Sequence, residues 1–288
     1  MLVLFIGTSF VTAKGLAVFM EIMCLNGWGG KMHAQLLPYL QSTQPDVLCL
    51  QEVVHTPSAD KSVLTYRDVG TELPQSARFF DDVCAALPHH SAFFCPAALG
   101  DLWDGDTRYE SYWGLATFVH KSIPIIGQAQ GFVHKAFSAN GYGDHPRSRS
   151  AHAVRLHDSE TGSPLTISHM HGLRDLAGKH DTPERRVQAQ RLRDLTFSIV
   201  EAGDQIVICG DFNVLPDSVT FDLFARDGLA DLVISRGFQG TRNSQYKKPG
   251  KFADYMLIND ELAHARFDVI YDPEVSDHCP LVLNTSQV

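Results

Sequence analysis

The stretch Ile206-Val207-Ile208-Cys209-Gly210-Asp211-Phe212-Asn213 decides which fold and which chemistry this sequence predicts. Its first four residues are apolar and mostly β-branched, and a glycine follows them, which is typical of a short buried strand. Asp211 and Asn213 are two residues apart, so an extended backbone places both side chains on one face. Oxygen ligands at a strand end suit a hard cation such as Mg²⁺, although Gly-Asp-x-Asn is also good turn chemistry.

Composition limits the partners and the compartment that we expect. The 288 residues are 44% apolar, enough for one large domain or two small ones. A net charge of −9 gives no global field that attracts nucleic acid or an anionic membrane, which leaves a local basic patch open. The six cysteines form no C-x-x-C pair, and Cys24, Cys49 and Cys209 fall in apolar runs. Free thiols fit a reducing compartment, so we predict a cytoplasmic protein.

Residues 1–19 do not read as part of the folded domain. Their apolar run is too short and too interrupted for a transmembrane helix, and no basic segment precedes it as in a signal peptide. We interpret them as a disordered or loosely attached extension before a single domain over 20–288. A cleaved export signal is the less favoured alternative. With no transmembrane segment and no long linker, we expect a monomer.

Two parts of the chain show the same order of elements. In the first, strands over 20–25 and 47–50 flank a helix over 31–43. In the second, strands over 165–168 and 206–208 flank a helix over 182–201, which begins with Thr182 as N-cap and Pro183 at its first position. This parallel favours an α/β sandwich with two related sheets packed together and helices outside.

The remaining segments are predicted less uniformly. We expect a loop and a peripheral helix over 55–78, and an exposed loop over 99–112, which is rich in Asp, Gly and aromatic residues. A basic loop is expected over 236–252. Further strands are predicted over 91–95, 114–126, 151–156, 254–258, 265–271 and 281–283, and a further helix over 79–87.

Polar residues stand at the ends of the predicted strands. Most of them alone have an ordinary structural interpretation: Asn26 as a turn residue, His169 as a core histidine and Asp254 as an edge carboxylate. Glu52 is less ordinary, because carboxylates avoid strand interiors unless they are paired or bound to a metal. Together they suit metal-assisted phosphoester hydrolysis, in which carboxylates hold Mg²⁺ or Mn²⁺, an acid or histidine activates water, and histidine and asparagine donate to the charged transition state. The set comprises Asn26, Glu52, His169, Asp211, Asn213, Asp254, Asp277 and His278.

This set resembles the motifs of the endonuclease/exonuclease/phosphatase superfamily, which includes deoxyribonucleases, abasic-site endonucleases, sphingomyelinases and inositol polyphosphate 5-phosphatases. The resemblance runs from about Met20 to Leu283, and its most specific parts are Gly-Asp-Phe-Asn at 210–213 and Ser-Asp-His at 276–278. It implies a four-layered α/β sandwich of two packed mixed sheets with helices outside. It also implies a divalent cation, Mg²⁺ or Mn²⁺.

The resemblance assigns a role to each position. Glu52 is the implied central metal ligand, with Asn26 and Asp277 beside it. Asp211 positions or deprotonates the water, and Asn213 lies on the phosphate. The resemblance also implies that His278, oriented by Asp254, contacts the scissile phosphate and that His169 stabilises developing charge.

Two positions depart from this pattern or add to it. Many members of the superfamily carry an acid two residues after the first asparagine, where this chain has Trp28. Because of Trp28, metal binding depends more heavily on Glu52 and Asp277, or the aromatic ring of Trp28 shapes a substrate pocket. His171 is a further candidate without a fixed role, and we interpret it as solvent-facing.

The substrate class stays open, because membership of a fold family fixes the bond type better than the substrate. We predict a metal-dependent phosphoester hydrolase of the phosphodiesterase or endonuclease type. Its alternative is a lipid or small-molecule phosphodiesterase or phosphatase, which the acidic balance and the aromatic residues near Trp103 suit. A binding module without activity is least favoured, because it would be expected to have lost Glu52, Asp211 or His278. Basic residues that suit a nuclease are Arg147, Arg149, Arg242, Lys247, Lys248 and Lys251. We slightly favour the alternative that they lie in a solvated loop.

Overall fold

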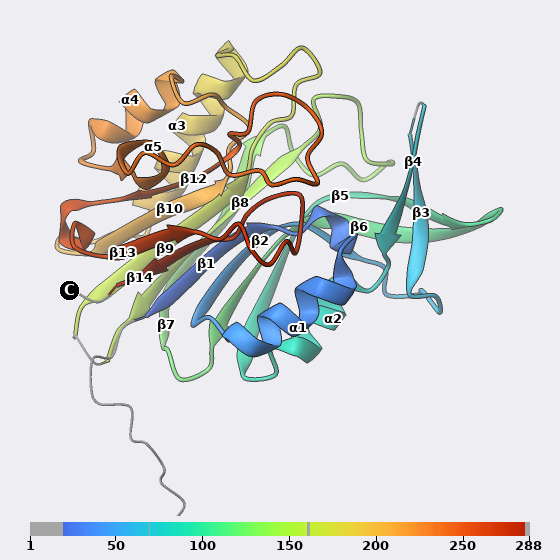
Figure 1. The fold of residues 1–288 in the computed structure, drawn as a ribbon, viewed down its shortest axis with the longest axis horizontal. Coiled ribbons are helices and arrows are strands. Elements are labelled where there is room, and N and C mark those ends of the chain that lie inside the picture. The colour runs from blue at the N-terminus through green and yellow to red at the C-terminus, as the bar shows by residue number, and fades with distance from the viewer. Residues whose placement is uncertain (1–19, 69, 160–161, 286–288) are drawn as a thin grey trace, which may run out of the picture.

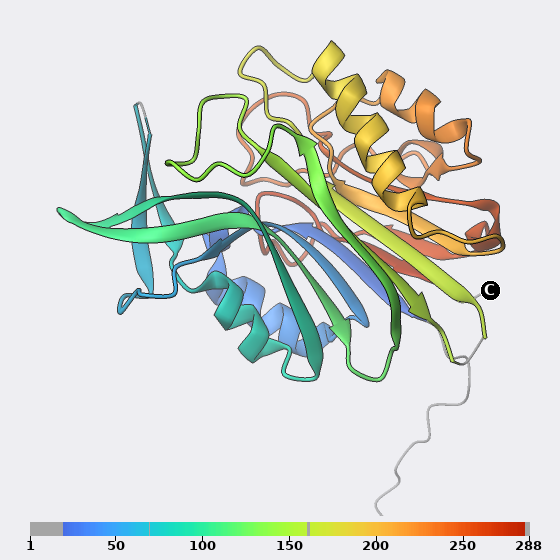
Figure 2. The same cartoon turned by 180° about the vertical axis from the view of Figure 1, so that it is seen from behind.

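The computed structural model describes residues 20–68, 70–159 and 162–285, so the predicted extension over 1–19 lies outside the described residues. Two mixed sheets dominate it (Figures 1 and 2). The first sheet has eight strands in the order β13 (Arg266–Val269), β14 (Leu281–Asn284), β1 (Glu21–Asn26), β2 (Val47–His55), β6 (Thr107–His120), β5 (His90–Asp104), β3 (Val63–Asp68) and β4 (Thr71–Ser76). The second has six, in the order β11 (Ala230–Asp231), β12 (Asp254–Ile258), β10 (Gln205–Asp211), β9 (Pro164–His171), β8 (Arg149–His157) and β7 (Ile125–His134).

Helices cover the outer face of each sheet, so the molecule has four layers (Figures 1 and 2). The first sheet is covered by α1 (His33–Thr43) and α2 (Phe79–Ala86), and the second by α3 (Pro183–Phe197), α4 (Val219–Ala225) and α5 (Leu232–Ser235). The short helices η1 (Trp28–Gly30) and η2 (Asp260–Leu262) complete the described helices. The predicted fold class, a four-layered α/β sandwich with helices outside, is confirmed.

The repeated strand–helix–strand order corresponds to two parallel crossovers. β1 and β2 pair in parallel with α1 between them in sequence, and β9 and β10 do the same with α3. Thr182 caps α3 by accepting a hydrogen bond from the backbone N–H of Arg185, and Pro183 is the first helical residue, as predicted. Because the strands of each pair run in the same direction, their carboxyl ends lie together at one edge of the sheet.

Apolar side chains fill the space between the layers. One cluster joins the facing sides of the two sheets and continues to α3, and it includes Ile22, Cys49, Ile167, Val207 and Leu192. A second cluster lies between the first sheet and its two helices. The six cysteines are all free thiols, and five of them are buried. Cys24, Cys49 and Cys209 are among the buried ones, in accordance with their prediction as small hydrophobic residues.

Two segments predicted without strands, a loop and a peripheral helix over 55–78 and an exposed loop over 99–112, instead form β-hairpins. The segment 55–78 contains the antiparallel pair β3 and β4, and 99–112 is the distal part of the long hairpin formed by β5 and β6. In the long hairpin, Leu102 is 1% exposed whereas its neighbours Asp101 and Trp103 are partly exposed. The alternation is that of a strand, but the charged and glycine residues around it are typical of a loop, and this caused the wrong prediction.

Candidate active site

The segment Asp211-Phe212-Asn213 forms a tight turn at the end of β10. Asn213 has a φ of 54°, and its backbone N–H donates to Oδ1 of Asp211 over 3.1 Å. The backbone N–H of Phe212 donates to the carbonyl of Ala253 over 2.8 Å, and the Phe212 ring is fully buried. Gly210 precedes this turn with a φ of 139°, and a Cβ there would lie 2.2 Å from the carbonyl oxygen of Met170. The turn therefore holds Asp211 in one orientation.

Asn26 links this turn to the first sheet. It ends β1 and has no exposed surface. Its Nδ2 donates to Oδ2 of Asp211 over 3.0 Å, and its Oδ1 accepts from the backbone N–H of Trp28 over 3.0 Å. Ser276 donates to the backbone carbonyl of Asn26 over 2.7 Å. Asn26 thus connects β1, β10 and the turn before β14 by hydrogen bonds.

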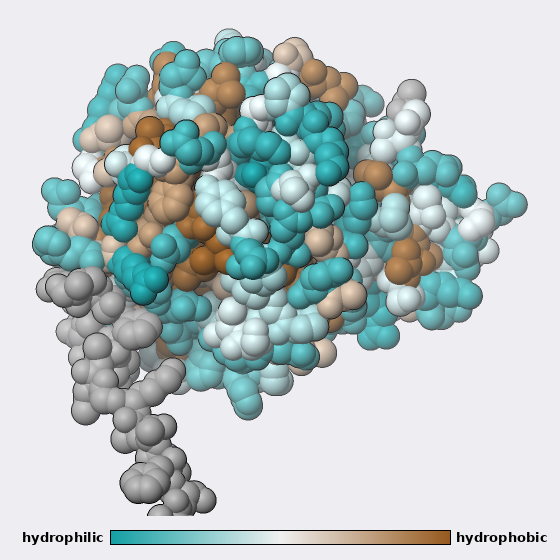
Figure 3. Space-filling view, in the orientation of Figure 1, coloured by the Kyte–Doolittle hydropathy of each residue, from teal (hydrophilic) through white to brown (hydrophobic). Residues whose placement is uncertain are grey.

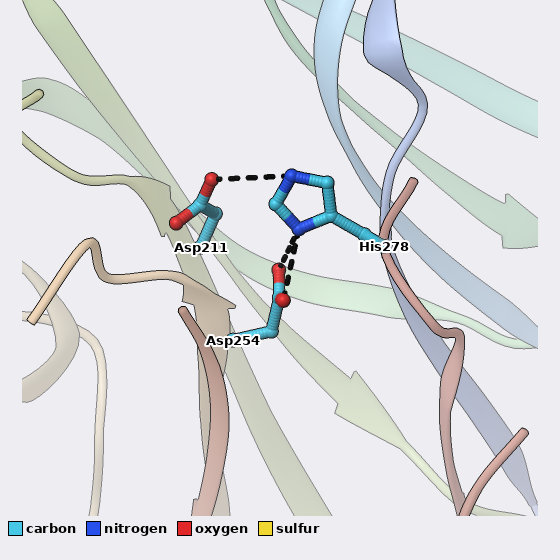
Figure 4. A group of neighbouring side chains, drawn as sticks. All are labelled: Asp211, Asp254 and His278. Carbon is cyan, nitrogen blue, oxygen red and sulfur yellow. Dashed lines mark hydrogen bonds and ion pairs between the residues drawn. The ribbon is translucent and has the colours of Figure 1, made fainter. Parts of the chain in front are cut away.

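His278 and Asp254 form a buried pair beside Asp211 (Figure 4). Nδ1 of His278 lies 2.8 Å from each carboxylate oxygen of Asp254, and its Nε2 lies 3.7 Å from Oδ2 of Asp211. Thr241 supports the pair, because its hydroxyl donates to Oδ2 of Asp254 over 2.8 Å. Burial raises the pKa of Asp254 to about 6, while burial and then the nearby Arg242 lower the pKa of His278 to about 3. Nδ1 therefore carries the ring proton and Nε2 faces Asp211.

Glu52 and Asp277 bring further carboxylates to the same place. Glu52 has a φ of 54° at a bulge in β2, and its side chain is 27% exposed although Gln51 and Val53 are both buried. Burial, then the charges of Asp277 and Asp211, raise the pKa of Glu52 to about 7. Oδ1 of Asp277 is buried and has no hydrogen-bond partner among the described residues.

These residues fit a divalent cation. The carboxylates of Glu52 and Asp277 and the amide of Asn26 supply hard oxygen ligands. A cation would both satisfy Oδ1 of Asp277 and offset the repulsion that, after burial, raises the pKa of Glu52. A second group of donor atoms, from Asp211, Asp254 and His278, lies within 4.8 Å of one another. In that group Nδ1 of His278 and both carboxylate oxygens of Asp254 are already engaged with each other. Glu52, Asp277 and Asn26 are therefore the better candidates to hold a metal.

Arg242 lies within this group of acids and not in a solvated loop. Its Nη1 lies 2.6 Å from Oδ2 of Asp277 and its Nη2 3.9 Å from Oδ2 of Asp211. The guanidinium stacks on Tyr246 at 4.5 Å, and only 9% of the side chain is exposed. The nearby acids raise the pKa of Arg242 although burial opposes them. Arg242 thus supplies a fixed positive charge beside the carboxylates.

The structure does not bring His169 to this group. Its Nδ1 lies 3.0 Å from Nε2 of Gln51 and its Nε2 2.8 Å from the hydroxyl of Thr117, so both ring nitrogens are bonded between the sheets. Two residues later on the same face of β9, His171 has its Nε2 3.8 Å from Oδ2 of Asp211 and 3.9 Å from Oε1 of Glu52. His171 is 3% exposed, which corrects its interpretation as solvent-facing. Burial, then the charge of Arg149, lower its pKa.

The other predicted site residues converge, and the structure adds three more. Asp211 pairs with His171 across β10 and β9, and this register is not visible in either strand alone. Trp28, in place of an expected acid, offers its backbone N–H to Asn26, and Nζ of Lys31 lies 3.9 Å over its ring. The residues brought together are Asn26, Glu52, Asp211, Asn213, Asp254, Asp277 and His278; those missed or misread are His171, Thr241 and Arg242.

The four-layered fold and the acid–histidine site define a phosphoester hydrolase. The model of the endonuclease/exonuclease/phosphatase family matches residues 23–278, so the chain belongs to this family, whose members are enzymes of that class. A family protein from Bacteroides thetaiotaomicron shares the fold with a TM-score of 0.65 and 15% identity, over 93% of this chain and 94% of that one. The mannosyl-6-phosphatase of the same organism has a TM-score of 0.61 and 15% sequence identity, over 92% of this chain and 98% of that one. The catalytic domain of human nocturnin with bound sulfate has a TM-score of 0.60 and 18% sequence identity, over 92% of both chains.

A search of curated proteins finds no match. Among the described residues, no helix combines the length and the apolar character that a membrane crossing requires.

Proposed function

We propose that this chain is a divalent-metal-dependent phosphoester hydrolase that uses Mg²⁺ or Mn²⁺ and activates water through Asp211. The observation that carries this proposal is the convergence of Asp211, the His278–Asp254 pair and the carboxylates of Glu52 and Asp277. Glu52 and Asp277, with Asn26, would hold the cation. When bound, it polarises the phosphoryl oxygen and stabilises the leaving group.

Asp211 is the best-oriented base. Asn26 donates to its Oδ2 and the backbone N–H of Asn213 to its Oδ1, so the carboxylate cannot rotate. A water bonded to Oδ2 would lie between His278 and His171, whose Nε2 atoms are 3.7 and 3.8 Å from that oxygen. Asp211 then accepts the proton of the attacking water.

His278, His171 and Asn213 face the phosphate in this proposal. Asp254 holds the Nδ1 proton of His278, so Nε2 of His278 is free to bond the phosphoryl group. Negative charge on the phosphoryl group favours protonation of that nitrogen, which then donates to the transition state. We assign His171 to the role that the family resemblance gave to His169, because only His171 lies beside Asp211.

The charge and polarity of the long β5–β6 hairpin favour a small phosphoester over DNA or a membrane lipid. The long β5–β6 hairpin carries exposed Asp104, Asp106 and Glu110 against one exposed cation, Arg108, at its distal end, and this excess of negative charge would repel a polyanionic backbone. That end of the molecule, at the right of Figure 3, shows mostly hydrophilic residues and only a few hydrophobic ones, unlike a membrane anchor. The likeness to a mannosyl-6-phosphatase and to a sulfate-bound nocturnin domain supports a small phosphate-bearing substrate.

Hydrolysis of simple esters tests the proposal. Purified protein would be assayed on p-nitrophenyl phosphate, bis(p-nitrophenyl) phosphate and supercoiled plasmid, with Mg²⁺, with EDTA, and as Asp211→Asn. We expect release of p-nitrophenol that both EDTA and the substitution abolish. Activity that survives both would point to a contaminating enzyme, and plasmid nicking that depends on both would restore the nuclease alternative.

A further inference from the structure

Arg149, the first residue of β8, is buried without a counter-ion. It is 3% exposed and makes no ion pair with any residue in the described part of the chain. Its Nε donates to the carbonyl of Gly172 over 2.8 Å and its Nη1 to the carbonyl of Ser148 over 3.1 Å, while its guanidinium stacks on Trp113 at 4.8 Å. Burial lowers its pKa to about 10, so it remains charged at neutral pH. A buried unpaired charge is costly and calls for a partner.

Three other arginines of this protein are paired with acids. Arg155 is paired with Asp204 at 2.8 Å, Arg193 with Asp227 at 2.6 Å and Arg147 with Asp68 at 2.7 Å. Arg185 is also buried without an acid, and its Nε has no hydrogen-bond partner among the described residues, but both of its terminal nitrogens donate to backbone carbonyls. Nη2 of Arg149 has no such partner among the described residues.

Shared neighbours place the guanidinium of Arg149 next to the candidate active site. The carbonyl of Gly172 that accepts from Arg149 also accepts from Nδ2 of Asn213, over 3.4 Å. Trp113, under the guanidinium, packs against the His171 ring at 5.1 Å. Glu52 and Asp211 are the acids whose charges act most strongly on Arg149, and they do so from beyond ion-pair distance. An anion bound next to Asn213 and His171 is therefore within the field of this guanidinium.

We propose that Arg149 determines substrate specificity by binding the second negative charge of a terminal phosphate, so that the site selects a phosphomonoester over a phosphodiester. This inference rests on the phosphoester hydrolase function proposed above. A phosphomonoester has a second pKa near 6 and is mostly a dianion at pH 8, whereas a diester keeps one charge. The planar fork of arginine suits two phosphate oxygens, and Arg242 is already occupied by Asp277 at 2.6 Å.

The test compares two esters with the same leaving group, p-nitrophenyl phosphate and bis(p-nitrophenyl) phosphate, at pH 8 with Mg²⁺. We expect Arg149→Gln to lower kcat/KM for the monoester about 30-fold or more, as for loss of a charged hydrogen bond, and for the diester less than about threefold. Arg149→Lys keeps the charge but loses the planar fork. Its kcat/KM for the monoester should therefore lie between the values of Arg149→Gln and of the wild-type protein. Arg193→Gln removes an equal charge far from the site and should change neither.

Equal losses on both esters by Arg149→Gln would overturn the inference and leave the hydrolase function standing. No hydrolysis of either ester by the wild-type protein would count against the hydrolase function itself. Calorimetric binding of inorganic phosphate then still tests Arg149: we expect about 30-fold weaker binding in Arg149→Gln and unchanged binding in Arg193→Gln. Unchanged binding in Arg149→Gln would overturn the inference. If Arg149→Gln does not fold, the same comparisons are made with Arg149→Lys. Loss of the planar fork should then selectively lower kcat/KM for the monoester and weaken the binding of inorganic phosphate.

Discussion

Nε2 of His171 lies 3.8 Å from Oδ2 of Asp211, and the two residues are register partners in the parallel pair of β9 and β10. His169 lies on the same face of β9, two residues before His171, and its register partner is Cys209. A displacement of two residues along one strand thus separates a histidine at the site from a histidine in the core. The two side chains should respond to substitution in opposite ways.

His171→Gln should lower kcat by about 10²- to 10³-fold with little loss of stability, because it removes a donor to the transition state. His169→Gln should leave kcat within a few-fold and lower the free energy of unfolding by about 1–3 kcal/mol, because Thr117 and Gln51 lose a buried partner. Kinetics on p-nitrophenyl phosphate and urea unfolding of both variants check this. The reverse pattern would return the phosphate role to His169.

Metal binding should depend on pH through Glu52. The pKa of its carboxyl is raised to about 7, so a proton competes with the cation below that pH. Apparent Mg²⁺ affinity should rise up to about tenfold per unit between pH 6 and 7 and then level off. Glu52→Gln should weaken binding about tenfold or more and remove this pH dependence, because one charged ligand is lost. Calorimetry at pH 6, 7 and 8 measures both effects, and a pH-independent wild-type affinity would contradict the prediction.

Acid should destabilise the protein through His152. Burial lowers its pKa to about 4, so it stays neutral in the folded protein while the unfolded chain takes up a proton near pH 6.5. Its contribution is therefore complete above pH 6.5 and is lost as the pH falls toward 4. Between pH 6.5 and 4.5 this amounts to about 2–3 kcal/mol of unfolding free energy. Urea unfolding at these two pH values should show a smaller decrease in the free energy of unfolding for His152→Gln than for wild type. Equal decreases in the two proteins would refute His152 as the cause.

Gly172→Ala should damage the site through the backbone. A Cβ at Gly172 would lie 2.3 Å from the carbonyl oxygen of Phe212 and 2.9 Å from that of Asp211. The catalytic turn would have to move, so we expect a loss of about 1–3 kcal/mol in stability and about 10²-fold in kcat. Gly131→Ala is the matched control, because its Cβ would meet only the flexible Leu195 side chain, at 3.3 Å. Wild-type kinetics for Gly172→Ala would show that the turn tolerates the shift.

Strand-end motifs in the sequence predict most of the site because the chemistry there depends on local order. Asp211 and Asn213, or Asp277 and His278, lie together whatever the rest of the chain does. The choice between His169 and His171 depends on how β9 aligns with β10, and Arg242 reaches the acids only through the folding of its loop. Both are long-range facts that residue type and spacing do not contain.

The same reasoning explains the fold. The buried strands and α3 have clear patterns and a clear cap, and the structure contains them. The β3–β4 and β5–β6 hairpins are partly solvated ribbons whose alternating pattern is weak, so local composition favoured loops there.

β1 lies between β14 and β2, and its pairing joins Glu21 to Asn284. A ribosome that has released only the first two thirds of this domain has therefore produced a first sheet with an open edge at β1 and no Asp277 or His278. Such long-range pairing is formed late and slowly. We therefore expect a chain truncated before Asp277 to lack the proposed hydrolytic activity.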